Sequence, residues 1–87
     1  MSEASMVFVG RKPMAVYLAK VITLLASNDR VVIVARGQFV LKAIRVGVRA
    51  ARATGCECHV NIDEERLESD EREILVPKIE ITLARRS

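Results

Sequence analysis

The sequence predicts an α/β fold, an α+β sandwich in which a four-stranded mixed sheet carries two helices on one face, in the order β-α-β-α-β-β. Three observations lead to this prediction. The chain has 87 residues, which is enough for a single domain spanning residues 1–87. Hydrophobic residues make up 51% of it, which excludes an intrinsically disordered chain. Apolar residues recur at helical spacing in two segments and at strand spacing in the remainder.

The first half of the chain predicts a strand, a helix and a second strand. Residues 6–9 form a short apolar run ended by Gly10, typical of a buried strand. Pro13 suits the first position of a helix, because its φ is already fixed and no N–H is needed there. Apolar residues then recur at helical spacing to about Ala26. Residues 30–35 include four consecutive β-branched residues, which favours a strand buried on both faces.

A second helix is predicted after the break at residues 36–38, and it extends to about Thr54. Gly55 suits the left-handed position that follows a helix. The apolar stripe of this helix is expected to contain Val40, Ala43, Ile44, Gly47, Val48 and Ala51.

Two further strands complete the prediction. Residues 56–62 alternate between apolar and polar, which predicts a half-buried strand with Cys56, Cys58, Val60 and Ile62 on the buried face. The charged stretch at about 63–74 is expected to be the loop of a hairpin. Residues 78–83 alternate again, and Pro77 places the start of this last strand at an edge or a bulge.

The helices are expected on one face of the sheet, because parallel crossovers are right-handed. The opposite face would then be exposed unless something covers it. This arrangement indicates either a dimer or a polar outer surface.

Charge is distributed unevenly along the chain. The net charge is +3, but residues 10–52 carry +8 and residues 63–73 carry −5. Four basic residues lie on one side of the second helix, at offsets 0, 3, 7 and 10: Lys42, Arg45, Arg49 and Arg52. An ordinary solvated helix face would interleave acidic residues, and none is present here. A polyanionic partner explains this uncompensated stripe better.

Two loops add to the same positive charge. Arg11 and Lys12 join the first strand to the first helix, and Arg36 joins the second strand to the second helix. Both loops lie at the carboxyl ends of strands and lead into helix N-termini, whose free N–H groups favour phosphate. Together the two loops predict one anion-binding surface.

The sequence at these loops resembles the Alba family of archaeal chromatin proteins. The resemblance rests on VGRKP at 9–13 followed by a helix, on VARG at 34–37 and on Lys42-Ala43, and it extends over residues 6–85. It implies a fold similar to the C-terminal domain of translation initiation factor three, a homodimer, binding of double-stranded DNA and RNA, and a place on the chromosome (the nucleoid) in the cytoplasm. It also implies nucleic-acid contacts from Arg11 with Lys12, from Arg36 and from Lys42.

Three departures from the family pattern indicate a divergent member or a paralogue. Arg11 stands where the family usually has an acetylatable Lys, and Gln38 stands where members often carry a second basic residue. The hairpin, usually polar or basic, is acidic here. We expect it to limit affinity, either by repelling phosphate or by folding back on the basic stripe.

Metal and catalytic chemistry find little support in the sequence. Cys56 and Cys58 share one face of the predicted strand, His59 points to the other, and the chain has no further His or Cys to complete a zinc site. The carboxylates cluster in one solvated stretch, a poor place to raise a pKa. We therefore expect no metal, no cofactor and no enzymatic activity, and we interpret the thiols as small hydrophobic groups.

The sequence thus predicts a dimer that binds double-stranded DNA, and RNA, without sequence specificity. The expected contacts come from Arg11, Lys12, Arg36, Gln38, Lys42 and Arg45. With aromatics at 3%, recognition by base stacking is disfavoured. Arg36 is expected to have no buried carboxylate partner. The alternative function is a subunit of a hetero-oligomer or ribonucleoprotein, a heterodimer with a basic paralogue held through the acidic hairpin. No signal peptide or membrane span is recognised.

Overall fold

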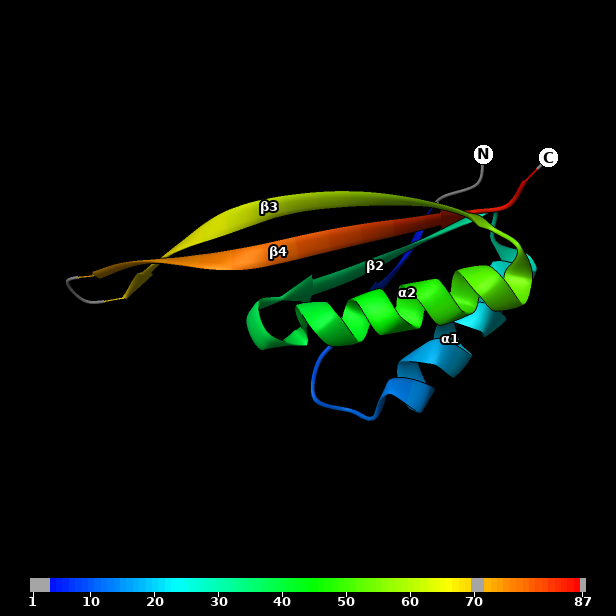
Figure 1. Ribbon diagram of the computed structural model, residues 1–87, viewed down its shortest axis with the longest axis horizontal. Helices are drawn as coiled ribbons and strands as arrows, with labels where there is room; N and C mark the ends of the chain where they lie inside the picture. The colour runs from blue at the N-terminus through cyan, green and yellow to red at the C-terminus, as the bar shows by residue number, and fades with distance from the viewer. Residues whose placement is uncertain (1–3, 70–71, 87) are drawn as a thin grey trace.

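The computed structural model describes residues 4–69 and 72–86 in two layers, a four-stranded sheet and two helices that cover one of its faces (Figure 1). The elements in chain order are β1 (Ser5–Phe8), α1 (Met14–Ser27), β2 (Arg30–Arg36), a short 3-10 turn η1 (Gly37–Phe39), α2 (Val40–Thr54), β3 (Glu57–Ser69) and β4 (Arg72–Ala84). The strand order is β1-β2-β4-β3, with β1 parallel to β2 and the other pairs antiparallel. The predicted fold class is confirmed.

The prediction of a loop over residues 63–74 is wrong. Here β3 and β4 continue as a paired ladder to the Ser69–Arg72 pair, and only residues 70–71 lie between them, outside the described part. Backbone pairing accounts for the difference, since cross-strand pairs such as Leu67 with Ile74 support the ladder. Both faces of this distal hairpin are solvated, so its sequence lacks the apolar alternation that would have indicated strands.

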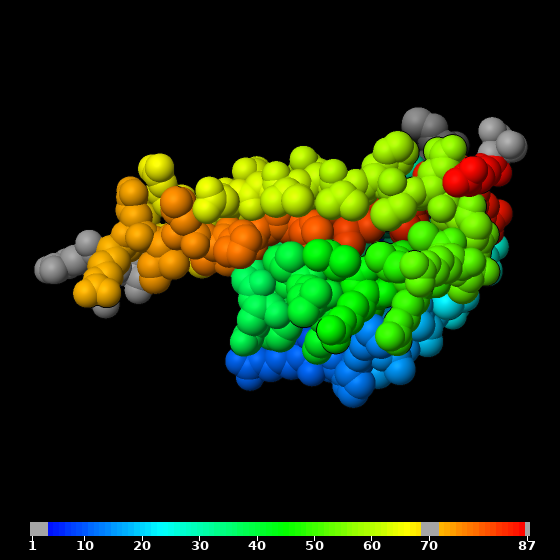
Figure 2. Space-filling model, in the orientation of Figure 1, coloured from blue at the N-terminus to red at the C-terminus, as the bar shows by residue number. Residues whose placement is uncertain are grey.

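The distal hairpin extends beyond the helical layer as an arm (Figure 2). The pairing of β2 with β4 ends at Arg36 and Lys78, so residues 72–77 of β4 are paired only with β3. Pro77 therefore lies where one side of its strand has no ladder, as its lack of an N–H requires. The predicted edge position of Pro77 is confirmed.

The core lies between the sheet and the helices. Its fully buried members include Ile33 and Leu83 on the sheet, Val21 on α1 and Val46 on α2. The first strand is buried on one face only, because Phe8 on the other face is 58% exposed.

Helix α2 packs with part of the predicted stripe and is rotated away from the rest. Ala43 and Gly47 are buried and Val40 and Ala51 pack partly buried against the core, as expected. Its buried residues are Ala43, Val46, Gly47 and Ala50, whereas Ile44 and Val48 are exposed. A Cβ built on Gly47 would lie 3.1 Å from Cγ2 of Ile81, so the helix approaches β4 closely through its small residues. The sequence pattern favoured the large side chains as core because it did not anticipate this close approach.

Of the four residues predicted to form the buried face of the strand over residues 56–62, only Cys56 is buried, and the other three are open to solvent. Cys58 is exposed, Val60 is 54% exposed and Ile62 is 74% exposed. Val60 pairs with Ile81 and Ile62 pairs with Ile79, so both lie on the helix-facing side of the sheet. Helix α2 packs chiefly on β4 and β2 and leaves this side of β3 uncovered. Exposed Ile44 and Val48 on α2 extend the same apolar surface.

Candidate nucleic-acid interface

The fold brings the two basic loops together. Strands β1 and β2 run parallel as neighbours, and the Val9 amide donates to the Val34 carbonyl at 2.8 Å, so both strands end at the same edge of the sheet. The loop after β1 carries Arg11 and Lys12, and their side chains are exposed. Strand β2 ends at the half-buried Arg36, and the exposed Gln38 follows in η1. The predicted convergence of these loops is what the topology produces.

A clamp of Tyr17 and Lys42 holds the first loop from both sides. The Tyr17 hydroxyl accepts hydrogen bonds from the amides of Gly10 at 2.9 Å and Lys12 at 3.1 Å. The Lys42 ammonium donates to the carbonyls of the same two residues, each at 2.8 Å. It also lies 5.9 Å from the ring centroid of Tyr17 and 5.6 Å from that of Phe39, within cation–π range. The loop backbone is therefore fixed to both helices.

Lys42 thus occupies a different place from the other predicted contacts. It is half-buried and two of its three donors are used on loop carbonyls, so it positions Arg11 and Lys12 rather than standing free beside them. Sequence reasoning missed Tyr17 altogether. The available signal was its position, four residues after Pro13 and four before Val21, on the face of α1 that is buried. A buried Tyr normally requires a partner for its hydroxyl.

The clamp leads to a prediction. Tyr17→Phe keeps the ring but removes the acceptor of two loop amides, so we expect a loss of about 1–2 kcal/mol in the free energy of unfolding. Hydrogen exchange of the Gly10 and Lys12 amides should accelerate more than that of core amides such as Val46. Denaturant unfolding and exchange measured by NMR test this. Unchanged exchange at both loop amides would show that the hydroxyl does not hold the loop.

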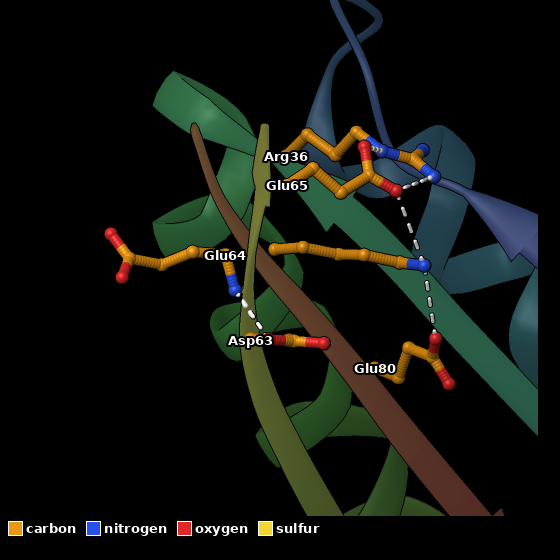
Figure 3. A network of polar contacts seen from close by, with 6 residues as sticks. Arg36, Asp63, Glu64, Glu65 and Glu80 are labelled. Atoms are coloured by element: carbon orange, nitrogen blue, oxygen red, sulfur yellow. Dashed lines mark hydrogen bonds and ion pairs between the residues drawn. The ribbon is translucent and has the colours of Figure 1, made fainter. Parts of the chain in front are cut away.

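Arg36 has a partly exposed carboxylate partner, whereas the prediction excluded only a buried one. Its Nε donates to Oε2 of Glu65 at 2.5 Å and its Nη2 donates to Oε1 at 2.9 Å. Glu65 lies on the hairpin, and the pairing of β3 with β4 brings it beside the end of β2 (Figure 3). The hydrogen bond from Arg36 holds the pKa of Glu65 below its ordinary value, and the same bond raises the pKa of Arg36. The partner was missed because the sequence predicted a loop where Glu65 lies in a strand.

The basic stripe of α2 is exposed along its length. The side chains of Arg45, Arg49 and Arg52 are solvent-accessible, and no ion pair to them is found among the described residues. Arg45 is one turn from Lys42 and therefore near the loops. Arg52 lies about 15 Å from Lys42 along the helix axis, at a rise of 1.5 Å per residue. Of the three, Arg45 is best placed to extend the loop surface.

Other site types are not found in the part of the chain that the structure describes. Within residues 4–69 and 72–86, no three His, Cys, Asp or Glu side chains gather as metal ligands would. Neither helix there has the length and apolar character needed to cross a membrane. A shallow hollow lies between the ends of α1 and α2, where Arg85 donates to the Leu25 carbonyl and Arg86 to the Gly55 carbonyl. These arginines satisfy the carbonyls at helix ends.

The chain is similar over nearly its whole length to archaeal proteins named DNA/RNA-binding protein Alba. It is 32% identical to the proteins of that name from Thermoplasma volcanium and Thermoplasma acidophilum, over 98% of this chain and 100% of each relative. It is 31% identical to the one from Picrophilus torridus, with the same coverage. No family model matches the chain.

Solved structures agree with these relatives. The structure of Alba from Thermoplasma volcanium superimposes with a TM-score of 0.83 at 29% identity, covering 93% of this chain and 100% of that one. ALBA1 from Trypanosoma brucei shares the fold, with a TM-score of 0.69 at 23% identity, covering 93% of this chain and 68% of that one. Sequence identity over the full length and the shared fold point the same way: this chain belongs to the Alba family.

Proposed function

We propose that this protein is a dimeric, non-enzymatic chromosome-associated protein of the cytoplasm that binds double-stranded DNA, and RNA, without sequence specificity. One observation carries the proposal, namely that two basic loops meet at one sheet edge and that Lys42 ties the first of them to the start of α2. The printed name of the archaeal relatives, DNA/RNA-binding protein, supports the same ligand class.

The contacts in this proposal are to phosphate. Arg11 and Lys12 are exposed on a fixed loop and can each hold a phosphate oxygen, and Gln38 offers a neutral amide donor beside them. Arg36 at the end of β2 and the exposed Arg45 on α2 add to this surface. Phosphate contacts determine the position of the protein on the duplex and much of its affinity, but they do not distinguish one base sequence from another. The described residues of this surface do not include a helix or β-ribbon that projects to enter a DNA groove and contact base edges. We therefore expect binding to be insensitive to the base sequence.

Dimerisation in this proposal buries the open apolar surface of α2 and β3. Leu41, Ile44 and Val48 on α2 and Val60 and Ile62 on β3 are exposed, and a contiguous surface of this kind marks an interaction site. We assign its occupant as a second copy of the chain, because a single domain of 87 residues is small and gains stability by burying this surface. A two-fold axis would then present two loop clusters to one duplex.

A salt titration tests the proposal. Four basic contacts per protomer, counted as Arg11, Lys12, Arg36 and Arg45, double in the dimer and give a slope of log affinity against log salt of roughly −7 on duplex DNA. The titration uses two unrelated DNA sequences and one RNA duplex. Similar affinity for both DNAs with a steep slope is the expected result. A slope near −2, or strong preference for one DNA sequence, would contradict the proposal.

The acidic arm favours a second candidate function, a subunit that pairs with a basic partner. The arm extends beyond the helices, and its side chains Glu64, Glu68 and Glu73 are exposed. Light scattering on the pure protein, with and without a duplex, separates the two functions. A dimer that binds the duplex unaided supports the first. A protein that binds only after a basic paralogue is added supports the second.

A further inference from the structure

Arg36 differs from the exposed basic residues of the proposed interface because its Nε and Nη2 already bind a carboxylate. Two parallel hydrogen bonds join its guanidinium to the Glu65 carboxylate, at 2.5 and 2.9 Å. A planar guanidinium uses the same fork to hold a carboxylate or a phosphate. A phosphate that arrives at Arg36 in this geometry must first displace Glu65.

Glu65 is itself held in place by neighbouring strands. Nζ of Lys78 lies 3.5 Å from Oε1 of Glu65 and 3.2 Å from Oε1 of Glu80 (Figure 3). The register places Lys78 opposite Arg36 on β2 and opposite Asp63 on β3, so the network spans three strands. The contact between Arg36 and Glu65 is therefore part of the folded sheet and joins the hairpin to the proposed interface.

The contact is also accessible. The side chain of Arg36 is 41% exposed and that of Glu65 is 33% exposed, so solvent and a ligand can reach both groups. Exposed ion pairs of this kind are weak in water, and a phosphate can replace the carboxylate. The Glu65 carboxylate can therefore be displaced from Arg36 by a phosphate, unlike the carboxylate of a buried structural ion pair.

We infer that Glu65 acts as an internal competitor for Arg36, so that a phosphate reaches the Nε and Nη2 donors of Arg36 only by displacing a carboxylate that the hairpin supplies. This inference rests on the proposed function and goes further, because it assigns the affinity-limiting effect of the acidic hairpin to one residue and one contact. It also links binding to release of the hairpin from the end of β2. The competition occurs at Arg36, away from the exposed stripe of α2.

Glu64 offers a matched control. It is the adjacent residue of β3, so its side chain lies on the opposite face of the hairpin, and its removal changes the charge by the same amount. Among the described residues no ion pair involves its carboxylate. Glu64→Gln therefore reports the general effect of one less negative charge, and Glu65→Gln reports that effect together with the loss of the contact to Arg36.

The experiment measures affinity for a mixed-sequence DNA duplex by fluorescence anisotropy at low salt. We expect Glu65→Gln to bind 3- to 10-fold more tightly than the unmodified protein and Glu64→Gln to bind at most twofold more tightly. In an Arg36→Ala background, Glu65→Gln should give no more than the Glu64→Gln effect. The NMR chemical shift of the Arg36 Nε–H group should change when duplex is added to the unmodified protein. In Glu65→Gln without duplex, this chemical shift should already differ from that of the unmodified protein.

Several outcomes would overturn the inference. If Glu65→Gln and Glu64→Gln raise the affinity equally, general charge repulsion explains the effect of Glu65. If Glu65→Gln still raises the affinity beyond the Glu64→Gln effect in the Arg36→Ala background, the competition occurs at another residue. Weaker binding by Glu65→Gln would make the contact a support for the hairpin. If the unmodified protein binds duplex and only these comparisons fail, the proposed function stands. If neither the unmodified protein nor any variant binds, both proposals fall.

Discussion

Replacing Arg11 and Lys12 together by Glu is expected to lower the affinity for duplex DNA by about 100-fold or more. A hydrogen bond to a charged group contributes about 1.5–3 kcal/mol, so losing two per protomer removes about 3 kcal/mol at least. Each 1.4 kcal/mol is a factor of ten in affinity. Reversal of the charge adds repulsion from the phosphates.

The folded state should be little affected by this double substitution. The loop is held through its backbone, by Tyr17 and Lys42, while the side chains of Arg11 and Lys12 are exposed. Thermal unfolding should therefore remain near that of the unmodified protein, which separates loss of contact from loss of structure.

The control for the double substitution is a pair with the same change in charge. Arg49→Glu with Arg52→Glu alters the exposed stripe toward the far end of α2. Anisotropy titrations of both pairs against one duplex should show a much smaller loss for the control. Equal losses would mean that total charge, and not the loop cluster, determines binding.

The element order and the position of the basic loops could be predicted from local patterns. The helices and strands follow from periodicities within short segments. The ends of the helices follow from single residues, namely Pro13 before α1 and Gly55 after α2, which has a φ of 72°. Because parallel neighbouring strands end at one edge, placing Arg11 near Arg36 required only the topology. These features depend on short-range rules.

The features that could not be predicted depend on long-range register. Glu65 meets Arg36 across 29 residues, and only the pairing of the long hairpin places it there. The Tyr17 clamp likewise depends on how the first loop folds over α1. The rotation of α2 follows from the contact of Gly47 with Ile81, a packing detail that hydrophobic periodicity does not contain. Each of these refines the proposed interface, and each depends on contacts that the local sequence pattern does not specify.

Introducing a charge at Ile62 is expected to convert the dimer to a monomer. The Ile62 side chain is 74% exposed on the helix-facing side of β3, in the apolar surface that we assign to a second copy. In the proposed dimer, Ile62→Glu or Ile62→Lys would bury one unpaired charge from each protomer in the interface, at a cost of several kcal/mol. Light scattering should show the mass of one chain for either variant. In the isolated chain the position is solvated, so the fold should be retained.

The expected effect on nucleic-acid binding is equally specific. A monomer presents four basic contacts instead of eight, so the salt slope should fall from roughly −7 to roughly −4 and the affinity by at least about 100-fold. Ile62→Lys is the sharper of the two variants, because it adds positive charge and should still bind more weakly. Ile74→Glu is the matched control, since Ile74 is exposed on the same hairpin but lies on the opposite face, and its dimer should persist. A dimeric Ile62→Lys protein with an unchanged salt slope would show that a second copy does not cover this surface.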